Sequence, residues 1–295
     1  MRPPHTIHAP WPEGIPSGRF ASTIERDDPS GCAVALLGLP DDTGVRLNHG
    51  RPGAGEGPAA FRAAMSRYGS ATPARGAGLP RVYDAGNVQP ADELNDTHAR
   101  VTEAVEAIHR AGMLPVAIGG GHDLTFPFVR AAANVHGPLA GIYLDAHLDV
   151  RSEPGSGMPF RALVDGGHAR ELHIHGLDRN ANSQEHLTWF QAHGGHVDSF
   201  THDDPPDAWP PGDLFVSLDL DVIDQAFAPG VSANNPNGWT PAKAEAWCAA
   251  AGRCDRVRCF DIMELCPPHD IAMHTSRLAV HLFYAFLAGF AERAT

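Results

Sequence analysis

Short apolar runs alternate with longer mixed segments along most of this chain. The runs are rich in Val, Ile and Leu and have the length of strands, whereas the segments between them have the length of helices. We predict strands near 33–40, 81–85, 114–118, 139–145, 170–176, 196–200, 213–222 and 257–265. We predict helices from near Pro58 and over 93–112, 124–137, 183–194, 240–252 and 274–292. This alternation is typical of an α/β fold whose parallel sheet is covered by helices on both faces.

The organisation of the chain predicts one domain. It has 295 residues, of which 43% are hydrophobic, enough for one large α/β core. No internal repeat, charge block or long linker divides it, so we expect a single domain over 1–295, with 1–30 as an irregular N-terminal arm. The loop at 146–169 is long enough to form one wall of an active site.

Charge and cysteine content narrow the class of function. The formal net charge of -13 disfavours nucleic acid and anionic membrane surfaces as partners, because binding to either needs a basic face. No apolar run approaches the length of a membrane span, and the Pro- and His-rich start lacks the apolar core of a signal peptide. The five cysteines fit neither a disulfide framework nor a zinc ribbon. We therefore expect reduced thiols and a cytoplasmic protein.

Three polar runs stand out because each directly follows an apolar, strand-like stretch. They are Gly-Gly-Gly-His-Asp at 119–123, Asp-Ala-His-Leu-Asp at 145–149 and Ser-Leu-Asp-Leu-Asp at 217–221. In a parallel α/β sheet the carboxyl ends of the strands lie together and form the edge where ligands bind. We therefore expect one cluster of two imidazoles and four carboxylates: His122, Asp145, His147, Asp149, Asp219 and Asp221.

So many ionisable groups in one place indicate metal binding. Four carboxylates would repel one another and would be unfavourable to bury unless cations lay between them. The donors are mostly oxygen, with two nitrogens and no thiolate, which favours Mn²⁺ over a structural zinc and leaves Fe²⁺, Co²⁺, Ni²⁺ and Zn²⁺ as alternatives. A pair of such ions can activate water for hydrolysis. The alternative reading is that these aspartates only cap helices and form turns.

The same three runs, in this order, resemble the ureohydrolase family, which includes arginase, agmatinase, guanidinobutyrase and formimidoylglutamase. RPGAGEGPAAFR (51–62), DIMELCPPHD (261–270) and the final helical segment extend the resemblance over most of the chain from about residue 33. The resemblance implies a three-layer arginase-like fold around a mostly parallel eight-stranded sheet. It also implies two Mn²⁺ ions per subunit and a homo-oligomer, either a trimer or a hexamer.

The resemblance further implies how the ligands are shared and which residues are catalytic. One ion would be held by His122, Asp145, Asp149 and Asp219. The other would be held by His147, Asp145, Asp219 and Asp221, so that Asp145 and Asp219 bridge the two. Glu264 would hold the cationic head of the substrate. Beside what the resemblance implies, we expect Asp149 to accept a hydrogen bond from the nucleophile and to shuttle its proton.

Residues around the metal runs imply the substrate. GVRxNxGRxGAxEGP, DAHLDVR, SGxPFR and SLDLDVIDQAFAPGVSAxNPxG look most like formimidoylglutamase, and Ser156 stands where arginase has a catalytic histidine. Guanidinium groups bind carboxylates in a bidentate way, so arginines near the site suit a dicarboxylate. Arg51 could instead only pin its own loop. The expected substrate contacts are Arg51, Arg151, Ser156, Arg161 and Asn182, with Asn180 in the same loop as Asn182.

Other features are expected to be structural. His173 and His175 have the spacing of metal ligands, but we expect them in the core or behind the ligands. Arg62 is expected on the surface of a helix. The glycine-rich run lacks the Gly-Lys-Ser/Thr of a phosphate-binding loop, and the chain has no Gly-x-Ser-x-Gly, so nothing supports a serine nucleophile.

The resulting hypothesis is a binuclear-metal hydrolase. It would cleave N-formimidoyl-L-glutamate to L-glutamate and formamide in histidine degradation, by attack of a hydroxide that bridges the metals. The expected partner is therefore a small molecule with carboxylate groups. The alternatives are a guanidine hydrolase of the same family (guanidinobutyrase, agmatinase or arginase) and a catalytically silent metal-binding homologue.

Overall fold

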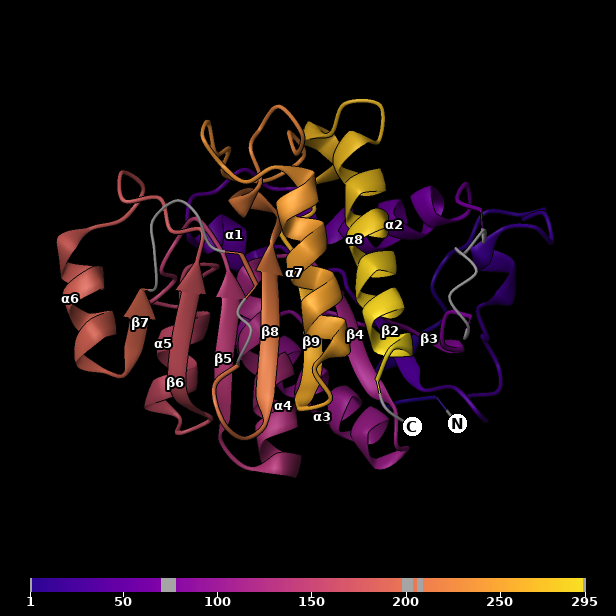
Figure 1. The fold of residues 1–295 in the computed structure, drawn as a ribbon, viewed down its shortest axis with the longest axis horizontal. Coiled ribbons are helices and arrows are strands. Elements are labelled where there is room, and N and C mark those ends of the chain that lie inside the picture. Colours follow the sequence, from indigo (N-terminus) through magenta and orange to yellow (C-terminus); the bar gives the residue numbers. More distant parts are fainter. Residues whose placement is uncertain (1, 70–77, 198–203, 206–208, 294–295) are drawn as a thin grey trace.

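A nine-stranded sheet forms the centre of the molecule (Figure 1), in a computed structural model that describes residues 2–69, 78–197, 204–205 and 209–293. The strands are β1 (Thr6–Ile7), β2 (Val34–Leu39), β3 (Val82–Val88), β4 (Leu114–Gly119), β5 (Leu139–Leu144), β6 (Ala169–His175), β7 (Gly195–Val197), β8 (Leu214–Asp219) and β9 (Val257–Met263). Their order is β1-β3-β2-β4-β9-β8-β5-β6-β7. Strands β2 to β9 pair in parallel, which confirms the predicted sheet, and β1 adds an antiparallel strand beside β3.

Helices cover both faces of this sheet. They are α1 (Thr43–Leu47), α2 (Gly57–Met65), α3 (Leu94–Arg110), α4 (Thr125–His136), α5 (Pro159–Asp165), α6 (Gln184–Ala192), α7 (Pro241–Arg253) and α8 (His274–Ala291). Short 3-10 turns are η1 (Phe20–Thr23), η2 (Ala54–Glu56), η3 (His122–Leu124), η4 (Leu220–Val222) and η5 (Pro267–His269). Side chains of α2, α7 and α8 form the core on one face, and those of α3, α4, α5 and α6 form the core on the other (Figure 1).

Strands β2, β4 and β5 carry no charged residue because both of their faces are buried. Along β2, Val34 and Leu36 enter one core, whereas Ala35 and Leu37 enter the other. This is the two-residue period of a strand, with helices on either side to receive the side chains. The result is the continuous apolar runs that predicted a parallel sheet.

Local signals set the helix starts. Pro58 lies in the first turn of α2, as predicted, where its missing N–H leaves no intrahelical bond unmade. Thr240 caps α7 by accepting a hydrogen bond from the Lys243 N–H, and Ser183 caps α6 in the same way. These caps satisfy amide groups that have no partner inside the helix.

One predicted strand is shorter in the structure, and another is described only in part. The strand predicted over 213–222 ends at Asp219, because residues 220–222 turn away as η4. The strand predicted over 196–200 is described only as β7, since residues 198–200 lie outside the described part of the chain.

The N-terminal arm is not irregular throughout. It contributes β1 to the sheet edge and buries Phe20 of η1 in the core. The Trp11 ring N–H donates to Asp84 (2.6 Å), which also binds Arg62 through an ion pair of 2.7 Å. Arg62 is 0% exposed, so the expectation of a surface position was wrong. Its guanidinium is buried because α2 lies directly against the sheet and Asp84 and Asn87 supply acceptors there.

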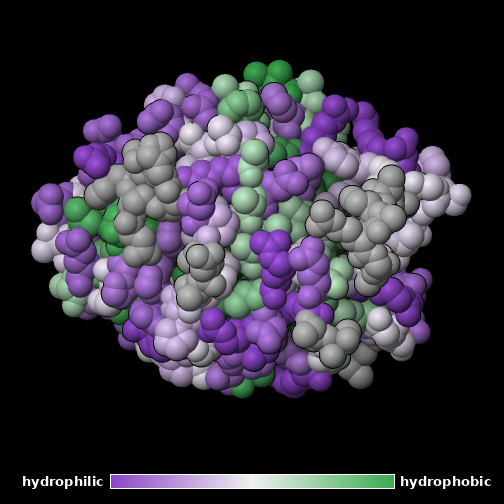
Figure 2. Space-filling view, in the orientation of Figure 1, coloured by the Kyte–Doolittle hydropathy of each residue, from purple (hydrophilic) through white to green (hydrophobic). Residues whose placement is uncertain are grey.

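The cysteines, the helices and the surface have the following properties. All five cysteines are free thiols. Among the described helices, none is long and apolar enough to cross a membrane. The face of the molecule seen in Figure 2 mixes hydrophilic residues (purple) with scattered apolar ones (green).

Candidate metal centre

The predicted ligands meet where four neighbouring strands end. In the sheet these strands stand in the order β4, β9, β8, β5. His122 follows β4 in η3, Asp145 follows β5 directly, Asp219 is the last residue of β8 and Glu264 follows β9 directly. The sheet therefore brings together residues that are far apart in sequence, as expected at the carboxyl edge of parallel strands.

One group of donors surrounds the His122 ring. Its Nδ1 lies 3.2 Å from Asp145 Oδ2, 3.0 Å from Asp149 Oδ2 and 3.1 Å from Asp219 Oδ2. One donor atom from each of these four residues lies within 4.8 Å of the others. This is one nitrogen and three oxygens at the separation that a single cation requires.

A second group lies beside the first. His147 Nδ1 is 3.0 Å from Asp221 Oδ2 and 3.6 Å from Asp145 Oδ1. Asp145 thus faces one group with Oδ2 and the other with Oδ1, as a carboxylate shared between two cations does. Asp219 is grouped with the first set only.

The backbone turns at 145–149 and does not continue as a strand. The His147 N–H donates to Asp145 Oδ1 (2.6 Å), and Asp149 has a left-handed φ of 47°. Asn182 holds this turn: its Oδ1 accepts from the Leu148 N–H (2.8 Å) and its amide donates to the Ala146 carbonyl (2.8 Å). Asn182 therefore positions the ligand turn and does not line the cavity described below, contrary to the expectation of a substrate contact.

A buried chain of hydrogen bonds orients the His122 ring from behind. Its Nε2 lies 3.0 Å from Ser217 Oγ, and Ser217 Oγ donates to Asp261 Oδ1 (2.6 Å). The Thr125 hydroxyl donates to the other oxygen of Asp261 (3.0 Å). Such partners behind a ligating imidazole fix its orientation and strengthen it as a ligand. The sequence contained the signal, because Ser217 and Asp261 stand in the matched runs, but only the pairing of β8 with β9 reveals their contact.

The buried carboxylates of the cluster would be stabilised by bound cations. Burial, and then the charges of Asp221 and Asp145, raise the pKa of Asp219 well above its ordinary value. Asp221 Oδ1 is buried and accepts no hydrogen bond from the described residues. A buried carboxylate oxygen without a donor is strongly unfavourable, and a divalent cation would satisfy it. The residues present therefore fit a pair of hard cations.

A cavity of about 250 Å³ opens over these donors. It is lined by Asn48, Gly50, His147, Asp149, Arg151, Ser156, Ala181, Asp219, Asp221, Ser232, Ala233 and Glu264. Arg151 and Ser156 belong to the loop between β5 and α5, so this loop forms one wall, as predicted. Asn48 and Ser232 were not among the predicted contacts, although both lie within matched motifs.

Glu264 faces the cavity from a strained position. Its φ of 64° is left-handed, which is uncommon for a residue with a side chain and is typical of functional sites. Its Oε1 accepts from the His122 N–H (2.9 Å), whereas Oε2 is buried and accepts no hydrogen bond from the described residues. Burial raises the pKa of Glu264 to about 8, and a cation nearby would favour the charged carboxylate.

Two predicted arginines lie outside this cavity. The Arg51 guanidinium donates to the Val231 carbonyl (2.6 Å) and to Asn234 Oδ1 (2.6 Å), so it pins the loop after β8. Arg161 lies over the Trp189 ring, 4.7 Å from its centroid. Their guanidinium groups are engaged by the protein itself, which leaves Arg151 as the arginine of the cavity wall.

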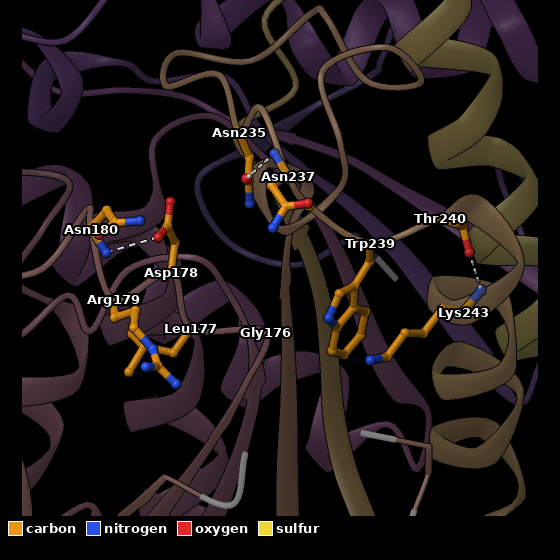
Figure 3. Close-up of a pocket in the computed structure, with 11 residues that line it drawn as sticks. Gly176, Leu177, Asp178, Arg179, Asn180, Asn235, Asn237, Trp239, Thr240 and Lys243 are labelled. Atoms are coloured by element: carbon orange, nitrogen blue, oxygen red, sulfur yellow. Dashed lines mark hydrogen bonds between the residues drawn. The ribbon is translucent and has the colours of Figure 1, made fainter. Parts of the chain in front are cut away.

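A second cavity, of about 540 Å³, is larger but holds none of the clustered ligands (Figure 3). It lies between the loop after β6 and the start of α7, where Asp178, Trp239 and Lys243 line it. Asn180 belongs here, with its N–H bonded to Asp178, and does not line the cavity over the metal ligands. The volume of a cavity therefore does not identify the candidate site, whereas the clustered metal-type donors do.

Comparison with known proteins agrees with this geometry. The profile of the Arginase family matches residues 32–289. The formimidoylglutamase of Rhodococcus jostii (strain RHA1) is 32% identical over 278 residues, covering 85% of this chain and 84% of that protein. The mitochondrial guanidino acid hydrolase of Homo sapiens is 29% identical over 294 residues, covering 90% and 81%. The crystal structure of Trypanosoma cruzi formiminoglutamase with Mn²⁺ superimposes with a TM-score of 0.84 at 28% identity, covering 94% of this chain and 99% of that one.

Proposed function

We propose that this chain hydrolyses N-formimidoyl-L-glutamate to L-glutamate and formamide with two bound Mn²⁺ ions. The chain belongs to the arginase family, which is the premise of this proposal. The observation that carries the proposal is the pair of donor groups sharing Asp145 beneath a cavity with Arg151 in its wall. The names of the formimidoylglutamase relatives and the Mn²⁺ in the Trypanosoma structure support the substrate and the metal. We further propose a cytoplasmic homo-oligomer, a trimer or a hexamer, that acts in histidine degradation.

The proposed ligands are the two donor groups. His122, Asp149 and Asp219 would hold one ion, His147 and Asp221 would hold the other, and Asp145 would contact both. When bound, the ions supply Lewis-acid activation of water at neutral pH. The hydrogen bond that His122 Nε2 donates to Ser217 Oγ would keep the ring turned toward the first ion.

Asp149 is the proposed proton acceptor. Its Oδ2 faces the His122 ring, which leaves Oδ1 for the proton of the attacking water. The residue also lines the cavity, so a proton taken up there can pass to the leaving nitrogen of the substrate. The leaving group is the α-nitrogen of glutamate, which must be protonated before it departs.

Glu264 is the proposed partner of the cationic amidine. Its Oε2 lies in the cavity wall and accepts no hydrogen bond from the described residues, and a formimidoyl N–H would satisfy it. Its other oxygen is fixed by the His122 N–H, so the side chain is already oriented before substrate binds. The amidine carbon would then be held beside the metal ligands.

Arg151 is the proposed partner of a substrate carboxylate, with Ser156 beside it. Both stand on one loop, which is pinned by the Ser156 N–H to the Gly44 carbonyl (2.9 Å) and by the Arg151 N–H to the Gly157 carbonyl (2.8 Å). A guanidinium fork binds a carboxylate through two parallel hydrogen bonds. Neutral or cationic tails, such as that of agmatine, would gain nothing from this contact.

A substrate panel with product identification tests the proposal. The Mn²⁺-loaded protein is offered N-formimidoyl-L-glutamate, 4-guanidinobutyrate, agmatine and arginine, and formamide and urea are quantified separately. We expect formamide from the first substrate and little urea from the others. Urea from guanidinobutyrate without formamide would instead favour a guanidino acid hydrolase, like the human relative. A full metal complement without any product would indicate a silent homologue.

A further inference from the structure

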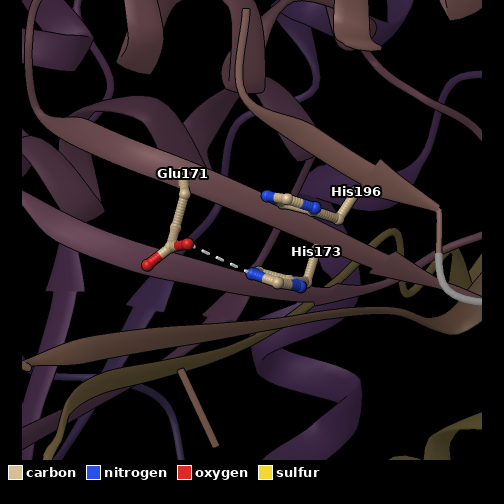
Figure 4. A group of neighbouring side chains, drawn as sticks. All are labelled: Glu171, His173 and His196. Atoms are coloured by element: carbon tan, nitrogen blue, oxygen red, sulfur yellow. Dashed lines mark ion pairs between the residues drawn. The ribbon is translucent and has the colours of Figure 1, made fainter. Parts of the chain in front are cut away.

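A second set of metal-type donors lies at the far edge of the sheet, away from the site above. Glu171 and His173 stand on β6 and His196 stands on β7. One donor atom from each of the three lies within 4.8 Å of the others. Both imidazoles direct a ring nitrogen toward the Glu171 carboxylate (Figure 4).

The strand register explains this convergence. Glu171 and His173 are two residues apart, so they share one face of β6. His173 pairs directly with His196 in the parallel register of β6 and β7, so the third side chain projects from the same face. The two rings stack with centroids 4.4 Å apart and planes 12° apart. The expectation of a purely structural role for His173 overlooked Glu171, the carboxylate two residues before it.

The carboxylate is oriented toward the imidazoles. Its Oε2 lies 3.5 Å from His173 Nε2, whereas its Oε1 lies 3.4 Å from Arg170 Nε. Arg170 is itself fixed by the carbonyls of Pro138 and Asp213. One oxygen is therefore anchored and the other faces the ring nitrogens.

One of the three separations is already that of two ligands on a single ion. Ligand atoms about 2.1 Å from a tetrahedral ion lie about 3.4 Å apart, and the contact between Glu171 and His173 already has this length. His196 is exposed, so its ring has room to turn the remaining distance toward them. Two imidazoles and one carboxylate with an open fourth position form a donor set that suits Zn²⁺ and similar transition metals. This set is richer in nitrogen than the oxygen-dominated pair of groups.

We infer that Glu171, His173 and His196 form a third metal site, for Zn²⁺ or a similar borderline cation, that fastens the edge strand β7 to β6. In the sheet of the described residues, β7 has three residues and stands at the edge, with a neighbouring strand on one side only. An ion held by side chains of both strands adds a cross-link where backbone pairing is weakest. The site lies outside the proposed catalytic centre, and its metal has no part in hydrolysis.

Zinc content measured by equilibrium dialysis tests the inference, with wild type compared with His196→Ala. Zinc also enters the paired centre in both proteins, so the difference between them isolates the third site. We expect wild type to hold one zinc ion per chain more than His196→Ala, with the paired centre filled in both. Glu171→Gln, which keeps the shape of the side chain, should lose the same ion.

His281→Ala is the matched control. His281 and Glu245 form an exposed His–Glu pair at 3.1 Å that belongs to no group of three donors among the described residues. The control should keep the wild-type zinc content. Zinc-edge anomalous diffraction from soaked crystals should also give a peak between Glu171, His173 and His196. Equal zinc content in wild type and His196→Ala, or no peak at this position, would overturn the inference whether or not the protein hydrolyses its proposed substrate.

Discussion

Replacing Ser217 by Ala tests whether the buried chain behind His122 supports metal binding. The change removes the hydroxyl that lies 3.0 Å from His122 Nε2 and donates to Asp261 at 2.6 Å. Thr125→Val is the matched control, because it also removes one hydroxyl bond to Asp261 (3.0 Å). Thr125 is not hydrogen-bonded to His122. Only the first variant therefore releases the ring of a proposed ligand.

The two variants separate stability from metal affinity. A hydrogen bond to a charged group contributes about 1.5–3 kcal/mol, so each variant should lower the free energy of unfolding of the metal-free protein by about 2 kcal/mol. Loss of a partner behind a ligating His weakens metal binding by about 10–100-fold, or about 1.4–2.7 kcal/mol. We expect this second loss for Ser217→Ala alone.

Manganese affinity is measured by titration calorimetry or by electron paramagnetic resonance of free Mn²⁺, and stability is measured by urea unfolding of the apoprotein. Ser217→Ala should show both losses, and Thr125→Val should show the loss of stability only. Wild-type manganese affinity in Ser217→Ala would refute the reasoning. Equal weakening in both variants would do so as well, because the effect would then come from Asp261 or from general loosening.

The other predictions concern the substrate contacts and the buried ion pair. Glu264→Gln keeps an acceptor for the His122 N–H but removes the charge beside the amidine, so kcat/KM should fall by about 10²–10³-fold with metal content unchanged; unchanged steady-state kinetics would contradict its role. Arg151→Ala should raise KM for the dicarboxylate substrate by about 10-fold or more and leave metal content intact, and an unaltered KM would remove it from the substrate site. Arg62→Met leaves Asp84 buried without its partner and should lower the free energy of unfolding by about 3–5 kcal/mol in urea titrations, whereas a loss below about 1 kcal/mol would contradict the buried pair. Burial acts to raise the pKa of Asp84, but Arg62 lowers it below the ordinary 3.8. The charged Asp84 therefore stabilises the fold fully above pH 3.8, and this stabilisation is lost as the pH falls further. The free energy of unfolding should therefore fall less steeply between about pH 5 and pH 3 in Arg62→Met than in wild type.

The sequence predicted the sheet well because its central strands are buried on both faces. Runs such as Val34–Leu39 and Leu139–Leu144 are buried at every position and contain no charged residue, and few other structures explain them. The predictions from sequence were wrong where contacts between distant parts of the chain decide where a residue lies. Arg62 looked like a surface residue because burial of a guanidinium depends on Asp84, whose contact with it arises only when α2 lies on the sheet. The two-residue strand β1 carries too few residues to show a pattern.

The candidate site was predictable in its ligands and less so in its surroundings. The six proposed ligands stand in short runs at strand ends, so topology alone brings them together. Substrate contacts lie on loops, and their direction depends on packing that a sequence does not record. Arg51 turns toward the carbonyl of Val231, and Asn182 turns toward the ligand loop, so neither lines the cavity. His196 was missed as a neighbour of His173 because only strand register places them side by side.

Anomalous diffraction at the manganese edge, from crystals soaked in Mn²⁺, tests the central claim most directly. The claim is that the two donor groups sharing Asp145 hold a pair of cations. We predict two peaks about 3.5–4 Å apart, one beside His122 and the other beside His147, with the Asp145 carboxylate between them. A single peak, or none among these side chains, would contradict the account.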